Sequence, residues 1–156
     1  MTQLFKKLNF KGQKEIFVIN SPTEFTHELE TMMKITSVKT DLKDCKELEF
    51  ILAFVKTKPE VDKMALIIEQ KLKGDGLVWF AYPKGTSKKY KAEINRDNGW
   101  ESIANIGLET VRAVAIDEDW SALRFRRVEF VKPMNRNEKI AITEEGKLRT
   151  KKNSGK

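Results

Sequence analysis

Apolar runs of strand length alternate with amphipathic segments along most of this chain. The clearest runs are EIFVIN (15–20), FILAFV (50–55) and LVWFAY (77–82), and a weaker one is ITSVKT (35–40). Two further strands are expected at 109–117 and 122–130. Runs that are apolar on both faces are typical of a largely parallel sheet that is covered on both sides.

Two of the helix starts between these runs carry the spacing of a capping box. Ser21 and Glu24 stand three residues apart, and so do Thr57 and Glu60. Within each pair, the side chain of one residue can accept a bond from the free backbone N–H of the other. Pro22 would then take the first helical position. The apolar faces of these two helices are expected to be Phe25, Leu29, Met32 and Met33 in the first, and Val61, Met64, Ala65, Ile68 and Leu72 in the second.

Two shorter helices complete the pattern. Thr2 is expected to cap one that ends before Gly12, and Asn98 with Glu101 to start one that ends at Gly107. The glycines of residues 74–76 are expected to separate the helix after Thr57 from the strand at 77–82. The short link between the last two strands predicts an antiparallel hairpin.

This order of elements predicts a single-domain α/β protein. It is a Rossmann-like three-layer sandwich, whose mostly parallel sheet ends in the antiparallel hairpin. Arg124, Arg126 and Glu129 indicate that the final strand has a solvated face or lies near an edge. The domain is expected to span residues 1–131, followed by a basic, flexible tail at 132–156.

The net charge of +7 belongs mainly to that tail. Residues 132–156 hold eight Lys/Arg and three Asp/Glu, a balance of +5, which leaves +2 for residues 1–131. The tail has few large apolar residues, so we favour a solubilising segment over a nucleic-acid-binding arm.

The remaining composition excludes several kinds of protein. A lone cysteine, Cys45, rules out an internal disulfide, and with acidic neighbours and a single histidine, His27, it is a poor candidate nucleophile. Neither a signal peptide nor a membrane span is found. A cytoplasmic protein with no membrane partner and no metal is expected.

Three stretches of the chain together carry a resemblance to a known family: LFKKLNFKGQKEIFVINSP, GDGLVWFAYPKGTSK and DEDWSALRFRRV. Over about residues 3–130 the chain resembles a family of small uncharacterised bacterial proteins, a domain of unknown function with a class I methyltransferase-like core. The resemblance implies the Rossmann-like fold and no activity. Compared with the full methyltransferase fold, this chain is expected to lack one strand–helix unit.

The end of the first strand argues against a methyltransferase cofactor. Such enzymes place a glycine-rich loop there, so that the backbone can approach S-adenosylmethionine. Here the strand runs through Asn20 and Ser21 into Pro22 with no glycine. Asp41, after the second strand, stands where a ribose-binding carboxylate is usual, although strand-ending aspartates often serve turns. Asn20, Ser21 and Asp41 are therefore only weak cofactor candidates, and no cofactor is expected.

A lysine-rich loop, PKGTSKK, follows the strand at 77–82. Because ligands bind open α/β sheets at the carboxyl ends of the strands, this loop is expected at the binding edge, although it is not a Walker loop. A solvated basic loop is the alternative. The candidate ligand-binding residues of this edge are Lys56, Lys84, Thr86, Ser87, Lys88, Asp117 and Trp120.

Two residues of this set have a structural interpretation that we favour. Asp117, with the two acidic residues after it, fits a hairpin turn better than a metal site, because consecutive side chains of a strand point in opposite directions. Trp120 fits a hydrophobic plug better than a stacking platform for a ligand.

These observations favour a non-catalytic protein that binds a small anionic ligand or a protein partner at the carboxyl edge. One alternative is an S-adenosylmethionine-dependent methyltransferase with an atypical cofactor loop. Another is a nucleic-acid accessory protein that uses the basic tail and the lysine-rich loop.

Overall fold

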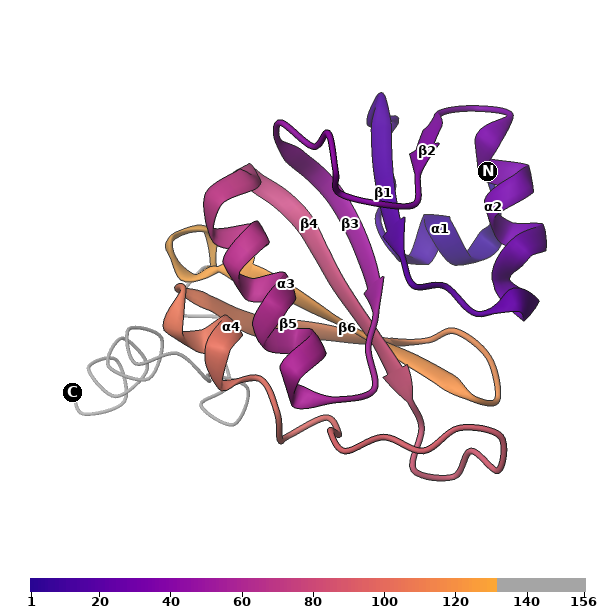
Figure 1. Cartoon of the computed structure of the whole chain (residues 1–156). Helices are drawn as coiled ribbons and strands as arrows, with labels where there is room; N and C mark the ends of the chain where they lie inside the picture. The colour runs from indigo at the N-terminus through magenta and orange to yellow at the C-terminus, as the bar shows by residue number, and fades with distance from the viewer. Residues whose placement is uncertain (132–156) are drawn as a thin grey trace.

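A six-stranded sheet in the order β2-β1-β3-β4-β6-β5 organises the chain (Figure 1). The computed structural model describes residues 1–131. The strands are β1 (Glu15–Ile19), β2 (Ser37–Lys39), β3 (Leu48–Phe54), β4 (Leu72–Pro83), β5 (Leu108–Ala115) and β6 (Trp120–Arg127). The helices are α1 (Gln3–Lys7), α2 (Thr26–Met33), α3 (Lys58–Lys71) and α4 (Glu101–Asn105), with 3₁₀ turns η1 (Thr23–Phe25) and η2 (Val128–Phe130).

The predicted fold class is confirmed. Strands β2, β1, β3 and β4 are parallel, and β6 lies antiparallel between β4 and β5. The last strand is therefore one place in from the edge, and β5 is the edge strand. The strand order reverses between β1 and β3, because β2 lies on one side of β1 and β3 on the other.

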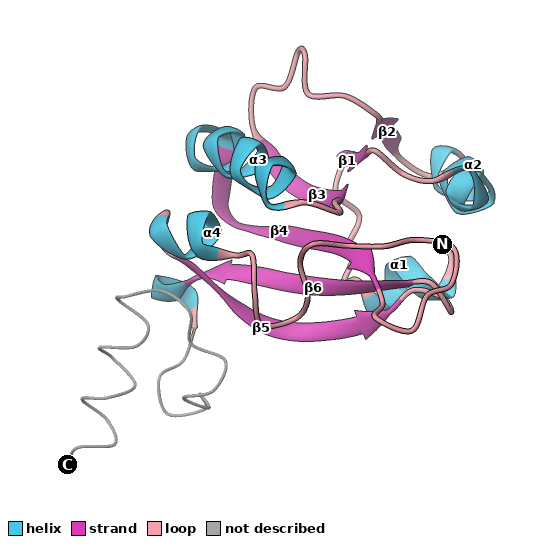
Figure 2. Cartoon of the chain, turned by 60° about the horizontal axis from the view of Figure 1, so that its bottom comes forward, coloured by secondary structure: helices cyan, strands magenta, loops and turns pink. Residues whose placement is uncertain are grey.

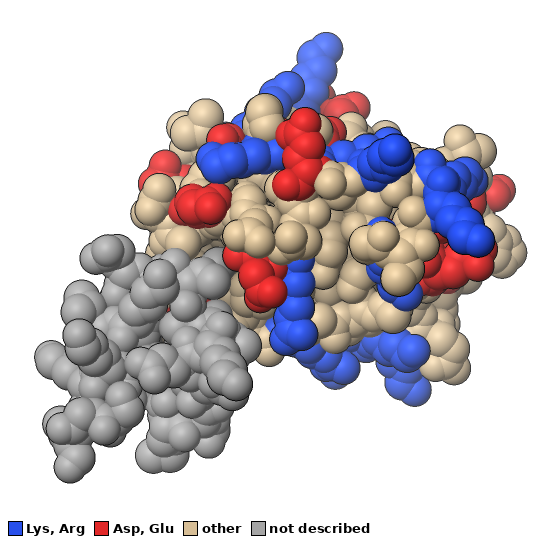
Figure 3. Space-filling view, turned by 90° about the horizontal axis from the view of Figure 1, so that it is seen from below, with Lys and Arg blue, Asp and Glu red and all other residues tan. Residues whose placement is uncertain are grey.

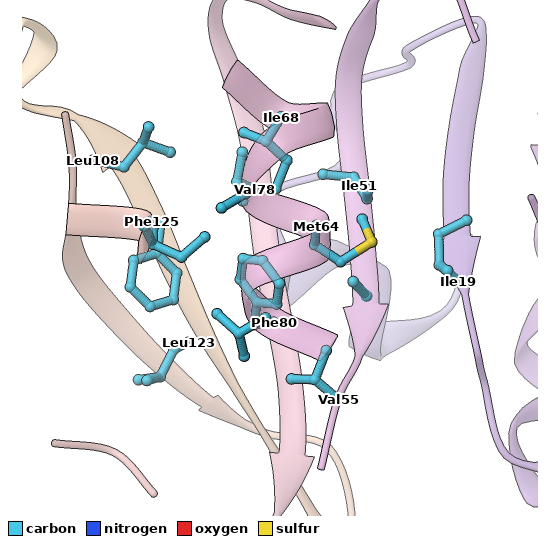
Figure 4. Close-up of a cluster of buried hydrophobic side chains, with 14 of the residues drawn as sticks. Ile19, Ile51, Val55, Met64, Ile68, Val78, Phe80, Leu108, Leu123 and Phe125 are labelled. Atoms are coloured by element: carbon cyan, nitrogen blue, oxygen red, sulfur yellow. The ribbon is translucent and has the colours of Figure 1, made fainter. Parts of the chain in front are cut away.

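Each face of the sheet has its own hydrophobic core. On one face α3 and α4, which lie side by side, cover side chains such as Ile51, Val78 and Phe80 (Figures 2 and 4). On the other face α1, η1 and α2 cover Phe50 and Trp79. Trp79 is fully buried, and its indole N–H donates to the carbonyl of Leu8 at 2.9 Å. This alternation of faces along β3 and β4 produces the three layers.

The capping predictions were half right. Thr57 and Glu60 form the expected capping box at the start of α3, and Thr2 caps α1 by accepting a bond from the N–H of Phe5. Ser21 and Glu24 form no such box: a 3₁₀ turn comes first, and α2 begins at Thr26 without a side-chain cap. The Glu24 carboxylate instead finds partners far along the chain, described below.

Several boundaries also differ from the prediction. Met33 is 51% exposed and does not pack inward, because α2 ends there. Residues 74–76 lie within β4, which starts at Leu72 because that residue pairs with Leu48 of β3 ahead of a register shift. The second strand has only three residues, and α4 starts at Glu101 rather than at Asn98.

The described residues bear differently on the predictions about the membrane, the tail and the location. Within residues 1–131 no helix has the length and apolar character needed to span a bilayer. The predicted basic tail, residues 132–156, lies outside the described part of the chain. The cytoplasmic location stays a prediction.

Candidate functional site

The carboxyl ends of the parallel strands meet at one edge of the sheet, and one long connection crosses it. We call residues 84–93 the strap. Its two ends are anchored by backbone bonds, from the Lys84 N–H to the Asp119 carbonyl and from the Glu93 N–H to the Lys56 carbonyl, both at 2.8 Å. Figure 1 shows the chain passing below the strand ends on its way from β4 to α4.

Tyr90 of the strap covers the point where the strand order reverses. Its hydroxyl donates to the Glu24 carboxylate, just after β1, and its ring lies against the ring of Trp120 with 4.9 Å between the centroids. The ammonium of Lys56 stands 4.9 Å from the centre of the same ring, and Lys89 forms a 3.0 Å ion pair with Glu24. We call these five residues the Tyr90 cluster.

The charges of this cluster stabilise one another. The hydrogen bond from Tyr90, assisted by Lys89, lowers the pKa of Glu24 to about 2. The same carboxylate raises the pKa of both Tyr90 and Lys89. At neutral pH the carboxylate is therefore ionised and the phenol and ammonium are protonated, so the strap is held over the strand ends.

Beside the Tyr90 cluster, with which it shares Lys89, the strap lines an open depression of about 510 Å³. Figure 3, viewed towards this edge, shows Lys/Arg and Asp/Glu side chains interspersed over the face. The depression is lined by Thr86, Lys88, Lys89, Glu118 and Asp119. Neither Lys84 nor Lys88 forms an ion pair with another described residue. Their charges are thus available to an anion at this rim.

Three of the predicted ligand-binding residues have structural partners here. The Ser87 hydroxyl donates to Asp119 at 2.8 Å and accepts a bond from the N–H of Tyr90. One oxygen of Asp117 accepts from the N–H groups of Asp119 and Trp120, both at 2.8 Å, which closes the β5–β6 turn. Trp120 is 2% exposed and packs between Phe54 and Tyr90, as a plug does.

Neither a metal site nor a reactive thiol is formed among the described residues. Within residues 1–131, no three side chains of His, Cys, Asp or Glu gather closely enough to hold a metal ion. Cys45 is buried, and its burial raises the pKa of its thiol. The thiolate that a nucleophile requires is disfavoured there.

The weak cofactor candidates lie at the strand ends but do not form a cradle. Asn20 is exposed with a φ of 57°, in the left-handed region that asparagine tolerates. Asp41 accepts a bond from the N–H of Lys43, which is a turn role. The φ angle of Gly85 lies outside the left-handed region, and a Cβ added at this residue would meet no atom within 4 Å. Position 85 therefore does not require glycine.

Tyr90, Lys89 and Glu118 were missed as site residues, and Glu24 was assigned only to a cap. An aromatic residue inside a run of lysines, SKKYK, was the available signal for Tyr90. The bond between Tyr90 and Glu24 joins residues 66 positions apart, so local spacing carried no information on it.

Comparisons with known proteins return structures but no sequence family. No family model matches the chain, and the search of curated proteins gives no match. The chain is similar to a Sulfolobus solfataricus protein assigned as a type 11 methyltransferase, with a TM-score of 0.48, 10% identity and coverage of 76% of this chain and 87% of that one.

Two further structures give the same level of similarity. The Methanococcus jannaschii fibrillarin pre-rRNA processing protein has a TM-score of 0.48 and 14% identity, over 75% of this chain and 67% of its own. A Streptococcus agalactiae protein of the NADB-Rossmann superfamily has a TM-score of 0.43 and 10% identity, over 81% and 68%. Such values say nothing of activity, and the fold assignment rests on the strand order itself.

Proposed function

We propose that this chain is a non-catalytic Rossmann-like protein that binds a small anionic ligand at the carboxyl edge of its sheet. The observation that carries the proposal is the open depression at this edge, because open α/β sheets hold their ligands at the carboxyl ends of their strands. The side chains of Tyr90 and Glu24 cover the point where the strand order reverses, so the depression beside them is the accessible part of the edge.

The lining of the depression supports a particular class of ligand. Lys88 and Lys89 supply ammonium groups and Thr86 supplies a hydroxyl, and Lys88 forms no ion pair with another described residue. Lys84, which also has no ion pair among the described residues, begins the strap, and its backbone N–H is bonded to Asp119 of this lining. Glu118 and Asp119, which also line the depression, are acceptors and would repel a bare anion. A small anion that also carries hydroxyl or amino donors fits both kinds of group, as a phosphorylated sugar or a hydroxy acid does. A protein partner that presents the same groups is the alternative.

The test compares two double variants of equal charge. Lys84→Gln with Lys88→Gln removes the rim cations, whereas Lys46→Gln with Lys63→Gln removes two exposed lysines elsewhere. The ¹H–¹⁵N NMR spectra of each protein are recorded with inorganic phosphate, sugar phosphates and hydroxy acids. We expect shifts in residues 84–89 and 118–119 of the wild type and the control, and none in the rim variant. Equal shifts in both variants would overturn the proposal.

A methyltransferase with an atypical cofactor loop is the second candidate, favoured by the strand order and by the position of Asp41 at the end of β2. Calorimetry with S-adenosylmethionine separates the two functions. We expect no heat of binding with the wild type, because Tyr90 covers the crevice. Tight stoichiometric binding would establish the methyltransferase alternative.

We also infer, from the stretches quoted above, a relationship to the small bacterial proteins of unknown function.

A further inference from the structure

Three arginines share one face of the antiparallel part of the sheet. Arg124 and Arg126 are two positions apart on β6, so their side chains leave the same face. Arg112 of β5 is the register partner of Arg124, and Trp79 of β4 is its partner on the other side. Because Trp79 packs in the core under α1, the arginines lie on that face, beyond the edge of that core.

This arginine cluster carries more positive charge than its neighbours balance. Asp75 holds Arg126 through two bonds, of 2.8 and 2.6 Å. Arg112 and Arg124 have no ion pair with another described residue. Glu109, the register partner of Arg126, is fully buried and takes part in interactions of its own. Among the described residues, Arg112 and Arg124 therefore have no ion-pair partner, and Asp75 is bonded to Arg126.

Arg124 shows the cost of this arrangement. Its side chain is half-buried, and its buried Nε–H has no hydrogen-bond partner among residues 1–131. Burial, followed by the charge of Arg126, lowers the pKa of its guanidinium; Asp75 partly opposes this shift, and Arg112 adds to it. Like charges directly opposite each other on paired strands are destabilising, and an unpaired buried donor on a charged group costs more than on a neutral one. The cluster is thus unfavourable for folding unless something binds it.

We propose that the arginine cluster is a binding site for a phosphate group, separate from the carboxyl-edge depression. A phosphate bound by the exposed guanidinium of Arg112 would supply a counter-charge to Arg124, and a shift of the Arg124 side chain towards it would let the phosphate accept a bond from the Nε–H that is now buried. Planar guanidinium forks match the paired oxygens of a phosphate. Arg112 is exposed, so the site is open to solvent on the β5 side. The source is either a free phosphate ester or the phosphodiester of a nucleic acid.

The test uses Arg112→Gln, with Arg96→Gln as the control, because Arg96 is an exposed arginine of the connection before α4. Melting temperatures are measured with and without inorganic pyrophosphate, and the Nε–H resonance of Arg124 is followed by NMR. We expect pyrophosphate to raise the melting temperature of the wild type and the control and to shift that resonance. Arg112→Gln should melt no lower than the wild type without ligand, because a repulsion is removed, while it binds about tenfold more weakly.

Two outcomes would overturn the inference. One is an unmoved Arg124 resonance at millimolar pyrophosphate. The other is a lower melting temperature of Arg112→Gln together with an unchanged response to pyrophosphate, which would mean that the cluster is only structural. Titration of a short single-stranded oligonucleotide at two salt concentrations identifies the source. If a nucleic acid binds, its log affinity falls by about 0.7 per phosphate contacted for each tenfold increase in salt concentration. The Lys84/Lys88 variant should bind like the wild type, which separates this site from the proposed function.

Discussion

Glu24 illustrates how a single side chain changes its role with its partners. Its spacing from Ser21 is that of a capping box, yet in the folded chain its carboxylate accepts bonds from Tyr90 and Lys89. Both donors come from the strap, so the carboxylate fixes the strap to the end of β1. The same contacts give the cluster a defined pH range. A carboxyl whose pKa is lowered by folding contributes stability above its unfolded pKa and loses that contribution as the pH falls through its folded value.

We therefore expect the stability that this contact contributes to be complete above about pH 5 and to be lost as the pH falls through about 2, where the folded carboxyl itself is protonated. Carbon-13 NMR of the Glu24 carboxyl measures this titration directly. In Tyr90→Phe, which keeps the ring but lacks the hydroxyl, the titration midpoint of Glu24 should rise towards its ordinary value of 4.5. An identical midpoint in the wild type and the variant would show that the hydroxyl does not hold the carboxylate.

At the scale of elements, the two predicted capping boxes had different outcomes for a physical reason. After Thr57 the chain enters a helix directly, so the box can close between residues three apart. After Ser21, Pro22 and a 3₁₀ turn intervene, and the first turn lacks the α-helical geometry that the box requires. Identical spacing in the sequence therefore produced one cap and one long-range contact.

This difference predicts unequal effects of two similar substitutions. Thr57→Ala should lower the free energy of unfolding by about 1 kcal/mol, because the backbone N–H of Glu60 in the first turn of α3 loses its acceptor, the Thr57 hydroxyl. Ser21→Ala should change it by less than about 0.5 kcal/mol, since Ser21 caps no helix. Urea unfolding of the two variants tests both values. A larger loss for Ser21→Ala than for Thr57→Ala would contradict the assignment of the caps.

At the scale of the whole molecule, burial is concentrated in the middle of the sheet. Strands β3 and β4 have neighbours on both sides and cores on both faces, and Leu52, Trp79 and Phe80 are fully buried. Strand β2 has three residues, one neighbour and no buried side chain. Within residues 1–131 no further strand pairs with the outer side of β2.

Native-state hydrogen exchange should follow this gradient. The amides of residues 51–54 and 78–81 should exchange only through global unfolding, whereas those of β2 should exchange through local opening of lower free energy. Measured protection factors along the chain test the expectation. Protection in β2 as high as in β4 would mean that this edge is covered in solution, for example by a second copy of the chain.

The sequence by itself determined the order of strands and helices, the three layers and the buried strand at 77–82. These features follow from periodicity and from caps, which depend on residues a few positions apart. Only the tertiary structure decided that Tyr90 lies on Trp120, that Glu24 holds the strap, and that Arg112 lies opposite Arg124. Such contacts are set by strand pairing and by the path of a long connection, which join positions that are remote in the sequence.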